Sequence, residues 1–333
     1  MGTELRAVDP HDDDALAARH AIAVAAIRHD LPDLPDPCPV WMAGALRIPN
    51  PAEQRRTWLA YRDGQPAGYL DAVLPTRENT GNVDIEMDVA PEHRRHGVGR
   101  ALYRNMVEAA RALGRVRVIG ASVSALPGGV ARAGTGTGFA TAMGAKNALQ
   151  EVRRRLDLST MDPATLTAAE AQGYSAVSWR DVAPEEYLAD LSWLDGRLIS
   201  DAPSGDLVIE VPAVDPGRIR DIQQAQLARG ARMYHAAIRH DATGSLVAWT
   251  ALAFEQTVPD HAWQHVTVVD PDHRGRRLGR WVKVANLRHT LPREPALRTV
   301  DTWNAETNRH MIAINEELGF RAVDAWIQWQ HEI

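Results

Sequence analysis

Residues 89–100 read VAPEHRRHGVGR, and residues 269–280 read VDPDHRGRRLGR, which aligns with the first stretch without a gap. The two stretches lie 180 residues apart, measured from Pro91 to Pro271. A long repeat period of this kind indicates two copies of one structural unit. The chain therefore predicts a duplicated fold.

The segments around the two stretches also match. Upstream, each copy has two alternating apolar runs joined by a Gly-containing turn, which is typical of a β-hairpin, and then an extended run that leads into the repeat. Downstream, a helical pattern precedes a short strand. The expected strands are 58–61, 67–74, 82–89 and 116–121 in the first copy and 236–238, 245–254, 265–269 and 297–303 in the second, with helices at 101–113 and 281–291.

The two copies need a boundary between them. A chain of 333 residues is long enough for two domains of ordinary size. The segment 153–179 is polar and contains Asp162-Pro163 and Gly173, which are loop signals. We therefore expect an N-terminal domain over residues 1–170 and a C-terminal domain over residues 171–333.

Composition and charge narrow the class of protein. The net charge of −6 argues against a surface shaped to hold nucleic acid or an anionic membrane. The only cysteine, Cys38, excludes an intramolecular disulfide and fits a reducing cytosol. The first residues lack the apolar core of a signal peptide, and no run approaches the about 18 apolar residues of a membrane helix. We expect a cytoplasmic protein that binds neither membrane nor nucleic acid.

The repeated turn has the properties of an anion site. A strand followed by Arg-x-x-Gly-x-Gly and a helix places unpaired backbone N–H groups at a helix N-terminus, where the helix dipole favours an anion. We expect Gly97 and Gly99 to let a phosphate approach the backbone. A P-loop is excluded because Arg100-Ala101 follows the last glycine, where that motif has Lys and then Ser or Thr. The remaining alternative, a glycine turn surrounded by solvated arginines, is disfavoured by its duplication.

These motifs resemble the GNAT superfamily of N-acetyltransferases, whose pyrophosphate-binding turn reads Arg/Gln-x-x-Gly-x-Gly/Ala after a Val-x-Pro strand. Residues 302–320, TWNAETNRHMIAINEELGF, look like the family's strand, Asn-led helix and terminal Leu-Gly-Phe. The resemblance covers nearly the whole chain as two copies, a layout similar to that of tandem members of the superfamily. It implies an α/β (α+β) fold of two acyl-CoA N-acyltransferase units, each a mixed, mainly antiparallel sheet flanked by helices and splayed at the turn.

The resemblance also implies acetyl-CoA as the cosubstrate, bound along the turns, and no metal. The residues expected to bind it in the first copy are Val89, Arg94, Arg95, His96, Gly97, Val98, Gly99 and Arg100. Those in the second copy are Val269, Arg274, Gly275, Arg276, Arg277, Leu278, Gly279, Arg280 and Asn308.

The two copies depart from the family pattern in different places. Residues 134–145 of the first copy lack the Asn and have too many glycines to predict a helix. In the second copy, Arg277 stands where the first copy has Gly97, so its side chain could crowd the pyrophosphate or bind it. Because only the second copy keeps the complete Asn-led helix, we expect the C-terminal half to be catalytic and the N-terminal half to be structural or to hold coenzyme A.

Transfer of an acyl group from a thioester to an amine needs a neutral amine, a polarised carbonyl and a protonated leaving thiolate. The candidate bases are His265, which titrates near neutrality, and Glu255, which would need burial to raise its pKa. Asn315 stands where the family commonly has a tyrosine that protonates the thiolate. Since an amide is a poor acid, water, Tyr234 or unaided release of coenzyme A are the alternatives.

Other polar residues have more than one interpretation. Asp84 and Glu86 share one face of a strand in the first copy and could coordinate an amine, or they could line a solvent-facing edge. His93 and His96 have ligand-like spacing, but no carboxylate or cysteine partner is evident, so we expect no metal site.

The sequence thus predicts an acetyl-CoA-dependent N-acetyltransferase that acts by direct attack on a primary amine of a small molecule. A protein or peptide amine is the alternative acceptor, because an acidic surface attracts a basic tail. Arg277 and Asn315 suggest a rival, a non-catalytic acyl-CoA-binding or sensor protein. A nucleic-acid-binding module is disfavoured by the net negative charge.

Overall fold

The computed structural model describes residues 2–167 and 170–333. The chain divides into two compact units, which are described separately. The N-terminal unit comprises Met1–Gln150, Gly205–Glu210 and Asp324–Ile333, and the C-terminal unit comprises Glu151–Ser204 and Val211–Val323. The expected division into domains near residue 170 stays a prediction. The compact units are not continuous in sequence, because the chain passes from one unit to the other four times.

The helices and strands follow the order that the repeat predicts. The first part of the chain contains β1 (Thr3–Ala7), α1 (Asp13–Asp30), α2 (Pro39–Arg47), β2 (Glu53–Arg62), β3 (Gln65–Pro75), β4 (Asn82–Val89), α3 (Val98–Ala112), β5 (Arg117–Ala125), α4 (Thr135–Ala142) and β6 (Lys146–Asp157). The second contains β7 (Tyr174–Arg180), α5 (Leu188–Asp201), α6 (Pro216–Ala228), β8 (Arg232–His240), β9 (Leu246–Phe254), β10 (His261–Val269), α7 (Leu278–Thr290), β11 (Thr299–Ala305), α8 (Arg309–Glu317) and β12 (Arg321–Glu332). Short 3-10 turns lie at Pro91–His93, Pro163–Leu166, Glu185–Tyr187 and Pro271–His273.

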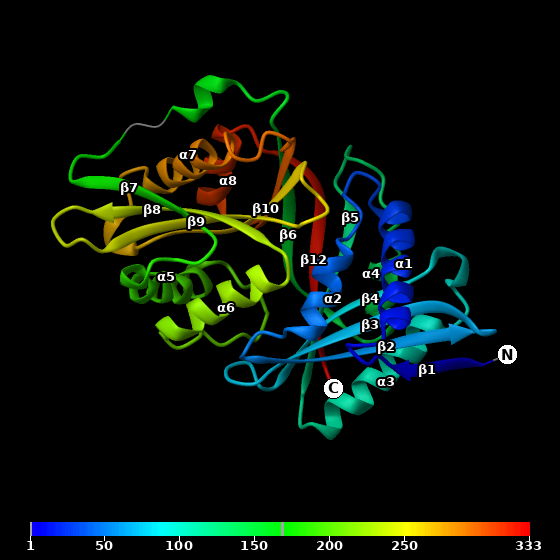
Figure 1. Ribbon diagram of the computed structural model, residues 1–333. Coiled ribbons are helices and arrows are strands. Elements are labelled where there is room, and N and C mark those ends of the chain that lie inside the picture. Colours follow the sequence, from blue (N-terminus) through cyan, green and yellow to red (C-terminus); the bar gives the residue numbers. More distant parts are fainter. Residues whose placement is uncertain (1, 168–169) are drawn as a thin grey trace. The chain divides into compact units, whose positions relative to one another are not determined.

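The N-terminal unit is a sheet with the strand order β1-β2-β3-β4-β5-β12 (Figure 1). Its strands are antiparallel except for β4 and β5, whose parallel pairing ends at Ile85 and Gly120. Beyond that point, β4 continues to Val89 without β5 as a partner, so the two strands part. Residues alternate between the faces: Leu70 packs on the side of α3, and Tyr69 packs on the side of α1 and α2.

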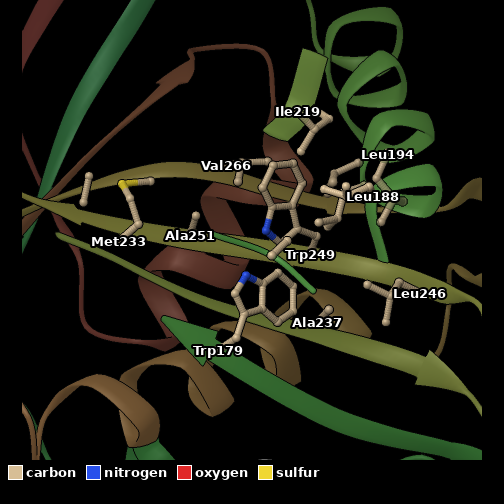
Figure 2. Packing of buried hydrophobic residues seen from close by; sticks show 14 residues of the cluster. Trp179, Leu188, Leu194, Ile219, Met233, Ala237, Leu246, Trp249, Ala251 and Val266 are labelled. Atoms are coloured by element: carbon tan, nitrogen blue, oxygen red, sulfur yellow. The ribbon is translucent and has the colours of Figure 1, made fainter. Parts of the chain in front are cut away.

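The C-terminal unit repeats this arrangement with the order β6-β11-β10-β9-β8-β7. The parallel pairing of β10 with β11 ends at Trp263 and Asp301. Strand β9 is buried along its whole length, with α7 on one face and α5 on the other. Figure 2 shows the second face, where Trp249 and Val266 pack against apolar side chains of α5 and α6. The predicted fold class, α/β with mixed, mainly antiparallel sheets flanked by helices, is confirmed.

The last strand of each copy belongs to the other unit. Residues 151–157 of β6 end the first copy in sequence but pair with β11, from Thr299 opposite Asp157 to Ala305 opposite Glu151. Residues 324–332 of β12 end the second copy but pair with β5. Each sheet is therefore completed by a strand from the other half of the sequence.

Helix α4 corrects the expectation that residues 134–145 are not helical. Gly136 lies directly against β5, where a Cβ atom would come within 2.8 Å of Cβ of Ser122. Phe139 packs edge-to-face on Tyr103 of α3, with ring centroids 5.9 Å apart. Packing against the sheet thus overrides the low helix propensity of glycine, and one of the glycines is needed for the close approach.

We expect two alanine substitutions in α4 to have opposite effects. Gly136→Ala should lower the free energy of unfolding by about 1–3 kcal/mol because the new methyl group overpacks the contact with β5. Gly138→Ala is the matched control, since a Cβ there meets nothing within 4 Å. It should raise stability by up to about 1 kcal/mol through helix propensity. Denaturant unfolding of both variants checks this, and equal stabilisation would show that α4 does not lie so close to β5.

Candidate functional site

Each of the two repeated turns has two residues with left-handed φ angles. Glycine is the second of these residues in the first turn and the first of them in the second turn. In the first turn, Arg95 and Gly97 have left-handed φ angles of 65° and 85°. In the second, Gly275 and Arg277 have φ angles of 79° and 59°. Arg277 therefore does not prevent the turn, although a non-glycine residue in this region costs about 1–2 kcal/mol.

Each turn leads into a helix whose first N–H groups have no side-chain cap. α3 begins at Val98 after Gly97, and α7 begins at Leu278 after Arg277, and neither preceding residue provides a capping side chain. A Cβ at Gly97 would meet nothing within 4 Å, so the space in front of this helix end is open. Uncapped N–H groups and the helix dipole together suit a phosphate.

The second glycine of the motif has a packing role. A Cβ at Gly99 would lie 3.4 Å from the Phe139 ring and 3.5 Å from Val89. A Cβ at Gly279 would lie 3.0 Å from Ile314 and 3.5 Å from Val269. These contacts let each helix pack closely on the end of its strand and on the following helix. Only the 3.0 Å contact at Gly279 is tighter than ordinary packing, and the role of Gly99 in phosphate binding stays a prediction.

The first arginine of each motif stabilises its own turn through a hydrogen bond to the backbone. Arg94 donates to the carbonyl oxygen of Val89 (3.0 Å) and to both oxygens of Asp30 (2.8 and 2.7 Å). Arg274 donates to the carbonyl oxygen of Val269 (3.1 Å) and forms an ion pair with Asp201. Each of these two guanidinium groups is therefore anchored to its own turn and to one carboxylate, and their role in phosphate binding stays a prediction.

The remaining cations distinguish the two turns. Within residues 2–167 and 170–333, Arg95 and Arg100 have no hydrogen-bond or ion-pair partner, and both side chains are exposed. In the second turn, Arg277 and Arg280 share the carboxylate of Glu317 at 2.8 and 3.3 Å. An anion at the second turn must compete with this carboxylate for Arg277 and Arg280. At the first turn, the positive charges of Arg95 and Arg100 have no competing carboxylate among the described residues.

A β-bulge distinguishes the strands that precede the turns. The pairing of β10 with β9 shifts between Gln264 and Val266, which leaves His265 unpaired and exposed. The side-chain nitrogen of Gln264, Nε2, donates to Thr250 Oγ1 (3.0 Å) and to the carbonyl oxygens of Ala251 (2.7 Å) and Val266 (2.9 Å). In the other unit, β4 pairs with β3 without a shift. Such bulges redirect side chains beside functional sites.

Desolvation favours the neutral form of His265, which is the form that a base needs. Desolvation by the surrounding chain lowers the pKa of His265 from 6.5, although the residue still reaches solvent. Its imidazole is therefore neutral at neutral pH. Glu255, the other candidate base, is half-buried directly after β9. Because Ala251 lies opposite Val266, Glu255 is displaced along the sheet by three to four residues from His265, roughly 12 Å, and the two candidates do not meet.

Asn315 is fully buried and takes part in a chain of hydrogen bonds that the sequence did not suggest. Its Oδ1 accepts from Lys283 Nζ of α7 at 2.6 Å, and its Nδ2 donates to Asn304 Oδ1 of β11 at 2.6 Å. Burial lowers the pKa of Lys283 to about 7. Tyr234, the other candidate proton donor, instead donates to Glu294 at 2.8 Å.

The N-terminal unit has ionisable side chains where the C-terminal unit has apolar ones. Tyr69 Oη lies 3.0 Å from Glu86 Oε1 and 2.9 Å from Asp88 Oδ2. One hydroxyl proton cannot serve both carboxylates. Desolvation raises the pKa of both, that of Asp88 to about 7, so the group holds an additional proton near neutrality. Desolvation also raises the pKa of Asp84, which is exposed on the same strand.

The corresponding positions of the C-terminal unit, 180 residues later, are Trp249, Val266 and Val268, which belong to one buried apolar cluster. Figure 2 shows Trp249 and Val266. The acidic face is thus confined to the first copy. It fits the expectation that Glu86 and Asp84 coordinate an amine, which stays a prediction.

Comparisons with known proteins agree with this architecture. A sequence model described as "Acetyltransferase (GNAT) family" matches residues 25–126. A solved structure of a tandem GNAT protein from the clavulanic acid biosynthesis pathway is 33% identical, with a TM-score of 0.88, and the match covers 99% of this chain and 98% of that one. The chain therefore belongs to the GNAT family of acetyltransferases and is a tandem N-acetyltransferase.

More particular relatives lie within this family. Mycothiol acetyltransferase from Thermomonospora curvata is 29% identical over 320 residues, which cover 92% of this chain and 91% of that protein. A GCN5-related N-acetyltransferase from Sphaerobacter thermophilus shares the fold, with a TM-score of 0.65 at 16% identity over 99% of this chain and 95% of the other. Acetyltransferases of the family use acetyl-CoA as their cosubstrate.

Two kinds of feature are absent from residues 2–167 and 170–333. No helix in the described part of the chain is long and apolar enough to span a bilayer. Among the same residues, no three His, Cys, Asp or Glu side chains are grouped so that they could hold a metal ion.

The buried lysine gives a test of pH-dependent stability. Since the pKa of Lys283 is about 7 in the folded chain and 10.5 is its ordinary value, the unfolded chain binds more protons between these values. Stability should therefore rise as the pH rises from about 7 to about 9. Lys283→Met should remove this increment. Urea unfolding of parent and variant at both pH values measures it, and parallel profiles of the two proteins would contradict the lowered pKa.

Proposed function

We propose that the protein transfers an acetyl group from acetyl-CoA to a primary amine of a small molecule by direct attack, without a covalent enzyme intermediate. The observation that carries this proposal is the bulge in β10, which exposes a neutral His265 in the unit that also has the complete Asn-led helix. A neutral imidazole can take the proton of an attacking ammonium group. In this proposal the C-terminal unit is catalytic.

A small-molecule acceptor is favoured by the relatives. One is named for mycothiol, and the other comes from the pathway of clavulanic acid, so both names refer to small molecules. A basic protein tail is the alternative acceptor. We also propose that the enzyme acts in the cytoplasm without a metal, a nucleic acid or a membrane, which fits its net charge of −6 and its single, buried Cys38.

The N-terminal unit is proposed to hold coenzyme A without being the main catalytic half. Its turn has the uncommitted Arg95 and Arg100, which suit a pyrophosphate. Its strand β4 lacks the bulge that sets His265 free in the other unit.

The second candidate is a non-catalytic acyl-CoA-binding or sensor protein. It is favoured by Glu317, which competes for the cations of the second turn, and by the amide of Asn315 in place of a proton donor. The two candidates differ in turnover: a sensor binds acetyl-CoA without releasing free thiol in the presence of any amine.

A carboxylate placed in each turn should separate the two binding sites. His96 and Arg276 are exposed and lie between the two left-handed residues of their turns. Arg276 also donates to the carbonyl oxygens of Asp272 (3.3 Å) and Arg274 (3.2 Å), so its variants are compared with each other as well as with the wild type. We expect Arg276→Glu to weaken acetyl-CoA binding in the C-terminal unit and to lower turnover about tenfold or more through repulsion of the pyrophosphate. His96→Glu should remove binding in the N-terminal unit with a smaller effect on turnover.

Calorimetric titration with acetyl-CoA and a thiol-release assay over an amine library measure both effects. His96→Gln is the control without added charge in the first turn, and Arg276→Gln separates the loss of the guanidinium charge from the effect of the new carboxylate. If the wild-type protein bound no acetyl-CoA, the proposed function would be wrong.

The base can be identified by a pair of glutamine variants. We expect His265→Gln to lower kcat/KM about 10²- to 10⁴-fold, the usual contribution of a general base. The wild-type rate should fall only at pH values below about 6.5, because desolvation lowers the pKa of His265 and the base must be deprotonated. Glu86→Gln is the matched control in the N-terminal unit. The opposite result, loss of the acidic limb in Glu86→Gln alone, would place catalysis in the N-terminal unit.

A further inference from the structure

Three buried or half-buried side chains connect α7 and α8 with the end of β11. Lys283 is 2% exposed and Asn315 is 0% exposed, and they join Asn304, which is half-buried. Both hydrogen bonds of this chain are 2.6 Å long. The ring of Phe320 lies 4.9 Å from the lysine nitrogen and adds a favourable contact for a cation.

The lysine fixes the orientation of both amides. Lys283 Nζ donates to Asn315 Oδ1, which turns the nitrogen of Asn315 toward Asn304. The protonated lysine, which predominates below its pKa of about 7, has no acceptor and makes this orientation obligatory. Asn304 must then accept with its oxygen, as it does in the structure. Its own NH₂ group is thereby turned away from Asn315, and in the described part of the chain neither of its N–H bonds has a partner. The relay therefore presents a donor, and not an acceptor, beyond Asn304.

The donor is presented where the sheet opens. The pairing of β11 with β10 ends at Asp301, three residues before Asn304. From there to Ala305, β11 pairs only with β6, so the edge that faced β10 has no strand partner. An extended ligand with amide or thioester carbonyl groups can lie along such an edge. The acyl-bearing arm of coenzyme A has this chemistry.

We propose that Asn304 donates a hydrogen bond to a carbonyl oxygen of the acetyl-CoA arm and that Lys283, acting through Asn315, is the positioning residue that keeps this amide in the donating orientation. The inference rests on the proposed function of the C-terminal unit. The N-terminal unit has no such relay: the residue 180 positions before Lys283 is Tyr103, whose hydroxyl lies 2.7 Å from His331 Nδ1.

An isosteric substitution tests the donor. Asn304→Asp keeps an oxygen for the hydrogen bond from Asn315 but presents a second oxygen, in place of NH₂, to the ligand. We expect it to raise the Kd for acetyl-CoA about tenfold or more, because an acceptor then faces a carbonyl. Binding of adenosine 3′,5′-bisphosphate, which lacks the arm, should change less than twofold. Asn147→Asp, an exposed change of the same charge in β6, should leave both affinities unchanged.

All proteins in these titrations also carry His96→Glu, so that only the C-terminal unit is expected to bind the ligand. At pH values below about 7, where Lys283 is mostly protonated, Lys283→Met tests the positioning step separately, since both amides can reverse without the ammonium group. We expect it to raise the Kd for acetyl-CoA about two- to tenfold, with no further loss when it is added to Asn304→Asp, as for residues that act through one contact.

Each outcome decides between the possibilities. Selective loss of acetyl-CoA binding in Asn304→Asp supports the inference. Unchanged binding, or an equal loss for the bisphosphate, overturns it, because Asn304 would then have no contact with the arm. Binding by the wild type but not by His96→Glu also overturns it, since the C-terminal unit would hold no ligand. Failure of the wild type to bind either molecule would instead show that the proposed function itself is wrong.

Discussion

The antiparallel ladder between β5 and β12 is the interaction on which the N-terminal unit depends. It runs from Ala125 opposite Asp324 to Arg117 opposite Glu332. The same strand supplies Trp329, whose indole nitrogen donates to Ser122 at 2.8 Å. The position of β5 in turn decides where β4 loses its partner and where α4 can pack. Strand β12 thus supports the part of the first copy that surrounds its glycine-containing turn.

Within this framework, one backbone serves two different sets of side chains. In both units, the parallel pairing ends before the first of the two paired strands does, and that strand leads into a turn with two left-handed residues. The chemistry diverges around that backbone. The N-terminal unit combines free turn arginines with an acidic face, whereas the C-terminal unit has an apolar core on that face, a bulge beside it and a buried lysine on the other side of the sheet. Duplication conserved the geometry and left the side chains free to specialise.

The sequence predicted the features that depend on local pattern. Strand β4 was predicted at residues 82–89 as observed, and the turns and the helices after them lie within a few residues of expectation. The missed features depend on contacts between distant residues. Helix α4 forms because Gly136 fits against Ser122, and the partner of Asn315 is Lys283, 32 residues away, which no spacing rule connects. The repeat cannot show that β6 and β12 are exchanged. Each of these strands has the same alternating pattern, which fits pairing within its own copy as well as pairing with the other copy.

The exchange of final strands also affects how the protein can be made. During synthesis, β5 emerges about 200 residues before the strand that pairs with it, and domains usually fold as their residues leave the ribosome. The nascent N-terminal half therefore carries an open sheet edge until β12 has been synthesised, and such edges readily pair with other chains. A chain that is truncated before β12 would carry its defect in the half that was synthesised first.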